Sequence, residues 1–188
     1  MGLIPAEAIR VPSSGDSARP SGWERAARSW LSGALEGTVH IVGVGNPIRQ
    51  DDAVGLEIVS SLRRRLGTRP APNIVIHPPS LMPERLLSRA AVGGRGLMVF
   101  DAVEANREPG SIVCASLAET KFGFFATHNA PLRLIPGVAD NLERCFVLGI
   151  QPESLGVGEE LSATVTEAKS RVVAAMSTII GGMQHGPP

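Results

Sequence analysis

Residues 38–66 read TVHIVGVGNPIRQDDAVGLEIVSSLRRRL, and this stretch decides the fold. Its first part, TVHIVGVG (38–45), is a β-branched run that ends in glycines and predicts a buried strand. The second half predicts a helix, because its apolar residues recur at helical spacing. Asp51 and Asp52 open this helix and arginines close it, and both ends suit the helix dipole. A strand, a short loop and a helix in this order are typical of an α/β protein.

Further strands and helices are predicted on the C-terminal side of this unit. Several of the strands are apolar on both faces, which is typical of a parallel sheet covered by helices on both sides. We therefore expect an α/β fold, a three-layer α/β/α sandwich around a mainly parallel sheet. The expected strands are NIVIH (73–77), GLMVFDAV (96–103), SIVCASL (111–117) and CFVLGI (145–150). The expected helices are residues 83–91, residues 130–141 and the segment that follows Ser162 as its N-cap.

The length of 188 residues, 43% of them apolar, favours a single domain. Residues 1–36 form an N-terminal arm, which is rich in Ser, Pro, Gly and Arg up to residue 22. Within this arm, residues 23–35 predict a short amphipathic helix docked on the domain. The domain itself spans residues 37–182, and residues 183–188 form a flexible tail.

The composition argues against partners that are nucleic acids or membranes. The 18 basic residues balance the 18 acidic ones, so no strong field attracts nucleic acid or an anionic membrane surface. No apolar run approaches about 20 residues, and the N-terminus lacks the apolar core of a signal peptide. We expect a cytoplasmic monomer. Cys114 and Cys145 lie in apolar stretches, which favours buried free thiols over a disulfide.

Polar residues follow several predicted strands, and in open α/β sheets ligands bind at this carboxyl edge. Asp52 follows the first core strand, Asp101 ends the GLMVFD run, and His128 lies in a loop that can reach the same edge. Two carboxylates and an imidazole are good ligands for a divalent cation such as nickel or zinc, and three protein ligands leave a position open. Other polar residues expected at this edge are Asn46, Asp51, Gln151 and Glu153.

Each of these three candidates also has a purely structural explanation. Asp52 serves equally as a helix-start acid, worth ~0.3–1 kcal/mol through the dipole. Asp101 serves as a cap for the loop after its strand, although an acid after an apolar run is costly unless it is paired or at the sheet edge. A single histidine such as His128 is most often hydrogen-bonded to backbone.

Nucleotide binding and nucleophilic catalysis receive less support. The GVGNPI segment has Ile48 where the dinucleotide fingerprint needs a small residue, and Pro47 lacks an amide hydrogen. Two carboxylates at the helix start would repel a pyrophosphate. The chain has no GxSxG elbow, and neither cysteine is placed like an exposed nucleophile.

Four ordered motifs resemble those of the nickel–iron hydrogenase maturation endopeptidases: GVGNPIRQDDAVG, VFDAVEANREPGSI, ATHNAPLRLI and FVLGIQPESL. The resemblance covers roughly residues 38–180. The last two motifs look most like the branch that serves membrane-bound, hydrogen-evolving hydrogenases. The resemblance implies a phosphorylase/hydrolase-like sandwich and a protein substrate, the precursor of the hydrogenase large subunit. Family members remove a C-terminal extension from this precursor after nickel has been inserted.

The resemblance also implies roles for the candidate residues. The family's metal-contacting acid falls on Asp52, its strand-end aspartate on Asp101 and its histidine on His128. These residues would be both catalytic and metal-contacting, and they would probe nickel carried by the substrate, with no resident organic cofactor. Asp51 and Asp101 are candidate bases.

The chain departs from the family pattern at two places. Gln50 stands where the family usually has glycine, so a Cβ restricts any positive φ there. Pro78 and Pro79 replace the usual glycine pair, which predicts a stiffer loop and a different substrate preference. These departures keep open the alternative of a non-catalytic module that senses a metallated partner. A small nucleotide-binding domain is a second alternative.

Overall fold

The computed structural model of the protein describes residues 20–34, 36–80, 87, 96–118, 138 and 143–183. Its centre is a five-stranded sheet with the strand order β2-β1-β3-β5-β4. Four of the strands run parallel, and β4 at one edge is antiparallel to β5. The strands are β1 (Val39–Gly43), β2 (Ile74–Ile76), β3 (Gly96–Ala102), β4 (Ile112–Ser116) and β5 (Cys145–Ile150).

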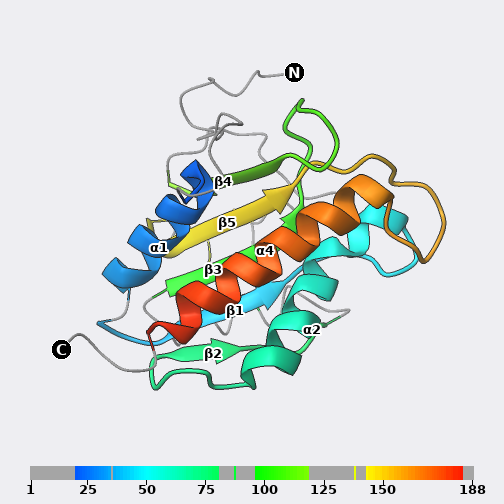
Figure 1. The fold of residues 1–188 in the computed structure, drawn as a ribbon. Coiled ribbons are helices and arrows are strands. Elements are labelled where there is room, and N and C mark those ends of the chain that lie inside the picture. The colour runs from blue at the N-terminus through cyan, green and yellow to red at the C-terminus, as the bar shows by residue number, and fades with distance from the viewer. Residues whose placement is uncertain are drawn as a thin grey trace.

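Helices α1 (Gly22–Ala34), α2 (Val54–Leu66) and α4 (Ala163–Gly181) cover one face of the sheet, as Figure 1 shows. Their buried apolar side chains form one cluster with side chains from all five strands. A second buried cluster lies on the other face of the sheet and includes Leu87 and Val138. The predicted α/β sandwich around a mainly parallel sheet is therefore confirmed.

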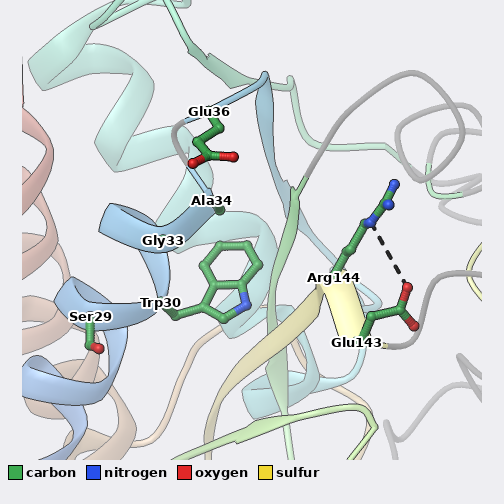
Figure 2. A pocket seen from close by; sticks show the side chains of 7 residues that line it. All are labelled: Ser29, Trp30, Gly33, Ala34, Glu36, Glu143 and Arg144. Carbon is green, nitrogen blue, oxygen red and sulfur yellow. Dashed lines mark ion pairs between the residues drawn. The ribbon is translucent and has the colours of Figure 1, made fainter.

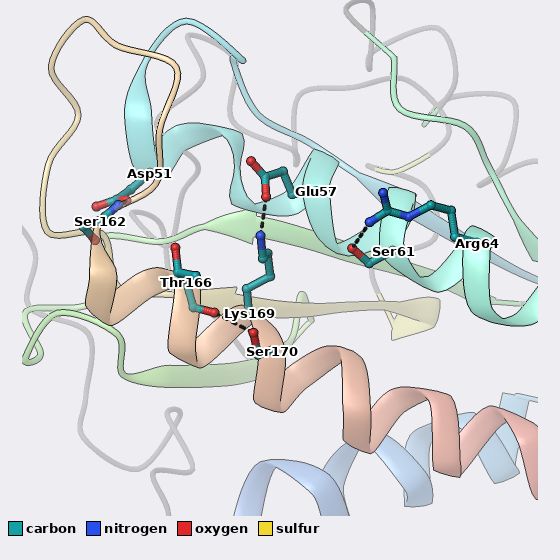
Figure 3. A network of polar contacts seen from close by, with 8 residues as sticks. All are labelled: Asp51, Glu57, Ser61, Arg64, Ser162, Thr166, Lys169 and Ser170. Carbon is teal, nitrogen blue, oxygen red and sulfur yellow. Dashed lines mark hydrogen bonds and ion pairs between the residues drawn. The ribbon is translucent and has the colours of Figure 1, made fainter.

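The two helices α2 and α4 lie side by side and are joined by an ion pair. Lys169 of α4 contacts the Glu57 carboxylate of α2, as Figure 3 shows. The predicted N-cap of α4 is also present, because the Ser162 hydroxyl accepts a hydrogen bond from the Val165 amide at 3.4 Å. This cap fixes the point at which the chain turns from the loop after β5 into α4.

One sequence-based expectation differs from the structure, and one strand has a direction that the sequence did not specify. The helix expected from Asp51 begins as a 3-10 turn, η1 (Gln50–Ala53), and becomes α-helical at Val54. The strand SIVCASL is antiparallel to its neighbour, because the chain from β3 returns to the sheet edge through a short loop and not through a crossover helix. The helices expected at 83–91 and 130–141 lie outside the described residues, apart from Leu87 and Val138.

Helix α1 contributes to the core although it lies on the N-terminal side of the family-like region. Its side chains Trp23, Ala27 and Leu31 are buried in the same cluster as those of α2 and α4. The division into an arm, a domain and a tail stays a prediction. None of the helices that the structure describes is long and apolar enough to cross a membrane.

Because α1 buries apolar side chains in the core, truncating one of them should lower the stability of the protein by a measurable amount. Leu31 is 0% exposed, so we expect Leu31→Ala to lower the free energy of unfolding by about 2–5 kcal/mol through lost contacts and a residual cavity. The neighbouring Ser32 is exposed, and Ser32→Ala is the control with little expected change. Denaturant titration of both variants measures the difference. Equal stability of the two would show that α1 adds nothing to the core.

Candidate functional site

Two buried carboxylates meet at the carboxyl edge of the sheet. Asp52 lies in η1, which follows β1, and Asp101 lies near the end of β3, the neighbouring parallel strand. Their exposed fractions are 0% and 1%. The two groups interact electrostatically, since Asp52 raises the pKa of Asp101. The sequence-based expectation that these two residues share one sheet edge therefore agrees with the described structure.

A close approach of backbone segments brings η1 against β3. A Cβ on Gly55, in the first turn of α2, would lie 2.2 Å from the Phe100 carbonyl oxygen and 2.3 Å from that of Val44. No side chain fits there, so glycine allows the start of α2 to pack on the ends of β1 and β3. Gly45 has a φ of +151°, and a Cβ on it would lie 2.0 Å from the Asp52 carbonyl oxygen. These glycines hold the Asp52 backbone beside the strand that carries Asp101.

The environment of Asp101 raises its pKa well above the usual value of 3.8. Burial is the main cause, and the charge of Asp52 is the second. The Ala102 amide partly opposes the shift, because it donates a hydrogen bond of 2.8 Å to Asp101 Oδ1. Within the described part of the chain, the buried Asp101 Oδ2 has no hydrogen-bond partner. One carboxylate oxygen is thus left for a proton or a cation.

Asp51, the neighbour of Asp52, has a structural role. Its carboxylate accepts hydrogen bonds from three backbone amides, those of Glu153 (2.8 Å), Ser154 (2.9 Å) and Ser162 (2.7 Å). Figure 3 shows Asp51 beside Ser162 at the start of α4. These bonds occupy both carboxylate oxygens, so the prediction of Asp51 as a base finds no support here. The residue fixes the loop between β5 and α4.

Gln50 adopts the left-handed backbone conformation, with a φ of +43°. Its amide donates to the Gly158 carbonyl at 2.8 Å, and its side-chain oxygen accepts a hydrogen bond from the Ser154 hydroxyl. Gly158 leaves room for this side chain, since a Cβ there would lie 2.9 Å from Gln50 Cγ. A Cβ makes a positive φ unfavourable by an amount of order 1–3 kcal/mol. The contacts of Gln50 with the loop after β5 offset this cost.

The other polar residues expected at this edge mainly support loops. The Gln151 side-chain oxygen accepts hydrogen bonds from the amides of Ala105 (2.8 Å) and Arg107 (3.3 Å) and so holds the loop after β3. Glu153 accepts a hydrogen bond from the Thr164 hydroxyl at 2.6 Å and is exposed. Asn46 accepts from the Ile48 amide at 3.1 Å, which closes a turn.

His128 lies outside the described residues, so its approach to the two carboxylates stays a prediction. Across the described ranges, no three His, Cys, Asp or Glu side chains are grouped as a metal site would require. Asp52 and Asp101 supply only two ligands. A third ligand for a cation must come from another part of the chain or from the substrate.

Thiol nucleophiles do not fit the described part of the chain. Cys114 and Cys145 are buried and do not form a disulfide, as the sequence predicts. Burial, with a smaller effect of Glu143, raises the pKa of the Cys145 thiol to about 12. A thiol with such a pKa is not ionised near neutral pH and is a poor nucleophile. The hydroxyls of Ser154 and Ser162 already bond Gln50 and cap α4.

Two hollows lie beside the sheet, one near the carboxyl ends of its parallel strands and one near their amino ends. A groove of about 310 Å³ adjoins η1 and contains Pro79, one of the two departures from the family pattern. Its other lining residues are Pro47, Ala53, Leu56, Glu57, Ser60, Ser80 and Glu159. A second hollow of about 350 Å³ lies beside α1 at the amino edge of the sheet and includes Trp30, as Figure 2 shows. Of these two hollows, the first includes a residue of η1, Ala53, which follows Asp52 in the chain.

Solved structures similar to this chain include hydrogenase maturation proteases. The protease HycI of Thermococcus kodakarensis has a TM-score of 0.68 at 26% identity, and the match covers 82% of this chain and 98% of that protein. The endopeptidase HycI of Escherichia coli has a TM-score of 0.57 at 25% identity, covering 73% of this chain and 87% of that protein. The Thermococcus kodakarensis protease HybD shares the fold, with a TM-score of 0.56 at 21% identity over 76% and 99% of the chains. No protein-family model and no curated protein sequence matches the chain.

These similarities and the buried carboxylate pair define the class of protein. The chain is a hydrolase of the endopeptidase class, built as an α/β sandwich. Within this class the chain is similar in fold to nickel–iron hydrogenase maturation proteases, the family that the four sequence motifs resemble.

The raised pKa of Asp101 gives the metal-free protein a defined dependence on pH. The folded protein keeps this proton to a higher pH than the unfolded chain does, so the free energy of unfolding falls as pH rises above about 4, until the folded pKa is passed. Asp101→Asn removes this titration. We therefore expect the stability of Asp101→Asn, relative to the wild type, to increase between pH 4 and neutral pH. Denaturant titrations at several pH values measure it, and a difference independent of pH would contradict the assignment.

The three hydrogen bonds to Asp51 predict a large cost when its carboxylate is removed. Asp51→Ala leaves three backbone amides without their acceptor, and we expect the free energy of unfolding to fall by about 2–4 kcal/mol. Glu160→Ala, an exposed carboxylate on the same loop, is the matched control and should change little. Thermal or denaturant unfolding compares the two. Similar small effects would mean that Asp51 does not hold the loop.

Proposed function

We propose that this chain removes the C-terminal extension of a nickel-loaded hydrogenase large-subunit precursor. The observation that carries the proposal is the pair of buried carboxylates, Asp52 and Asp101, at the carboxyl edge of a maturation-protease fold. In this proposal His128 completes the set of residues that contact the nickel. The protein would act in the cytoplasm as a monomer and would need no resident organic cofactor.

The electrostatics of the pair explain why a metallated substrate would be preferred. Two like charges without water are unfavourable, so in the absence of a cation the pair is most stable with a proton on Asp101. A divalent cation on the precursor replaces that proton and neutralises both carboxylates. A precursor without nickel offers no such compensation. The charge of the two carboxylates would therefore favour binding of a precursor that carries nickel over one that does not.

The chemistry that we propose follows from the same contacts. Nickel held by the precursor and by Asp52, Asp101 and His128 is a Lewis acid that can polarise the scissile carbonyl or lower the pKa of an attacking water. In its ionised form, Asp101 has an oxygen without a protein partner in the described residues. That oxygen is the one placed to contact the cation or to accept a proton from water.

The left-handed backbone of Gln50 bears on the alternative of a non-catalytic module. A non-glycine residue before Asp52 would favour that alternative if it changed the conformation of the loop. The loop retains a positive φ and is tied to the segment after β5. The departure at Gln50 therefore gives no reason to favour sensing without cleavage.

The site residues can be tested by processing of the precursor. Asp101→Ala, Asp52→Asn and His128→Ala should each abolish shortening of a nickel-loaded precursor, because each removes one contact with the cation. Far-UV circular dichroism checks that the variants fold, and mass spectrometry of the precursor measures the loss of its C-terminus. Glu104→Gln, an exposed carboxylate in the loop after β3, is the matched control and should process normally.

Failure of the wild type to shorten any candidate precursor would overturn the proposed function. A stable complex with the precursor and no cleavage would instead support the non-catalytic module. Tight binding of NAD or ATP, measured by calorimetry, would favour the nucleotide-binding alternative.

A further inference from the structure

We propose that Ile48 and Val157 form an apolar docking surface for the polypeptide substrate, next to the carboxylate pair. Ile48 is 58% exposed and Val157 is 92% exposed, and within the described ranges they are the exposed large hydrophobic residues. Exposed apolar residues that gather in one place indicate interaction sites more often than scattered ones do. The inference rests on the proposed function, because it concerns how the same substrate is held.

The two residues are brought together by backbone pairing between distant segments. The Gly158 amide donates to the Ile48 carbonyl at 3.0 Å, and the Gln50 amide donates to the Gly158 carbonyl at 2.8 Å. Arg49 and Gly158 accordingly form a parallel β-bridge. Ile48 and Val157 therefore lie on two adjacent, paired pieces of chain and present one surface.

Several side chains make this surface rigid. The Asp51 carboxylate holds the amides of Glu153, Ser154 and Ser162, and the Arg49 guanidinium donates to the Leu155 carbonyl at 3.2 Å. A preformed surface loses little conformational entropy when it binds a partner. Rigid apolar side chains are therefore better suited to docking than the same residues on an unanchored loop.

The docking surface is coupled to the site by the chain itself. The Asp52 amide donates to the Arg49 carbonyl at 3.0 Å, so Ile48 and Asp52 lie on the same short turn. The groove beside η1 continues this surface, since its lining includes Pro47 and Glu159. Because Asp52 and Asp101 are buried, a protein substrate that delivers a group to them must contact the surface residues near them.

The charges around the apolar pair define the partner's chemistry. Glu153, Glu159 and Glu160 are exposed on the same loop as Val157, whereas the Arg49 guanidinium is held by a carbonyl. An apolar centre with an acidic rim fits a protein surface that has apolar side chains flanked by Lys or Arg. The occupant that we assign is therefore the folded precursor, through an apolar patch with a basic border.

The test measures cleavage and binding of the nickel-loaded precursor by the full-length protein. Val157→Asp and Ile48→Asp should each raise KM by about tenfold or more, and the loss should lie in KM and not in kcat. Both side chains are exposed, so the variants should fold. Ala174→Asp makes the same change at an exposed position of α4, far along the helix from its start, and should leave both constants unchanged.

Each outcome decides between the two proposals. If the wild type cleaves the precursor and the Ile48 and Val157 variants match it in KM, the docking surface is overturned while the proposed function stands. If the wild type binds the immobilised precursor without cleaving it, weaker binding by the variants supports the docking surface alone. Absence of binding by the wild type overturns both. If light scattering shows a wild-type dimer that Val157→Asp dissociates, the surface holds a second copy and the inference is wrong.

Discussion

Two carboxyl groups of like charge, those of Asp52 and Asp101, lie together without access to water, and much of the local structure serves this arrangement. The arrangement costs stability in the isolated protein, because burial and mutual repulsion both oppose ionisation. The fold sustains it through a close packing of η1 and α2 on β1 and β3, which Gly55 permits. In many enzymes a preorganised site lowers the stability of the folded state locally, and burial of a large apolar core offsets this loss.

Asp51 and Asp52 show how neighbouring residues of one type obtain opposite roles. Asp51 points toward the loop after β5, where three backbone amides satisfy its charge. Asp52 is buried beside Asp101 instead. The first carboxylate ties two segments together, while the second lies beside Asp101 and raises the pKa of that residue.

The carboxyl edge of the sheet gathers the features that bear on substrate. The carboxylate pair, the groove that contains Pro79, and the exposed residues Ile48 and Val157 all lie there. The amino edge instead carries the hollow beside α1, close to the ion pair of Glu143 and Arg144. This division follows from the parallel strands, because loops at their carboxyl ends converge where the strands stop.

The sequence by itself determined the α/β class, the N-cap Ser162 and the shared edge of Asp52 and Asp101, because periodicity, caps and strand ends are local signals. The placement of His128 stays a prediction. Tertiary structure alone decided that β4 runs antiparallel, that α1 joins the core, and that Asp51 anchors a loop. The reason is distance along the chain, since Asp51 and Ser154 are 103 positions apart and no local pattern encodes which amides a buried carboxylate will meet.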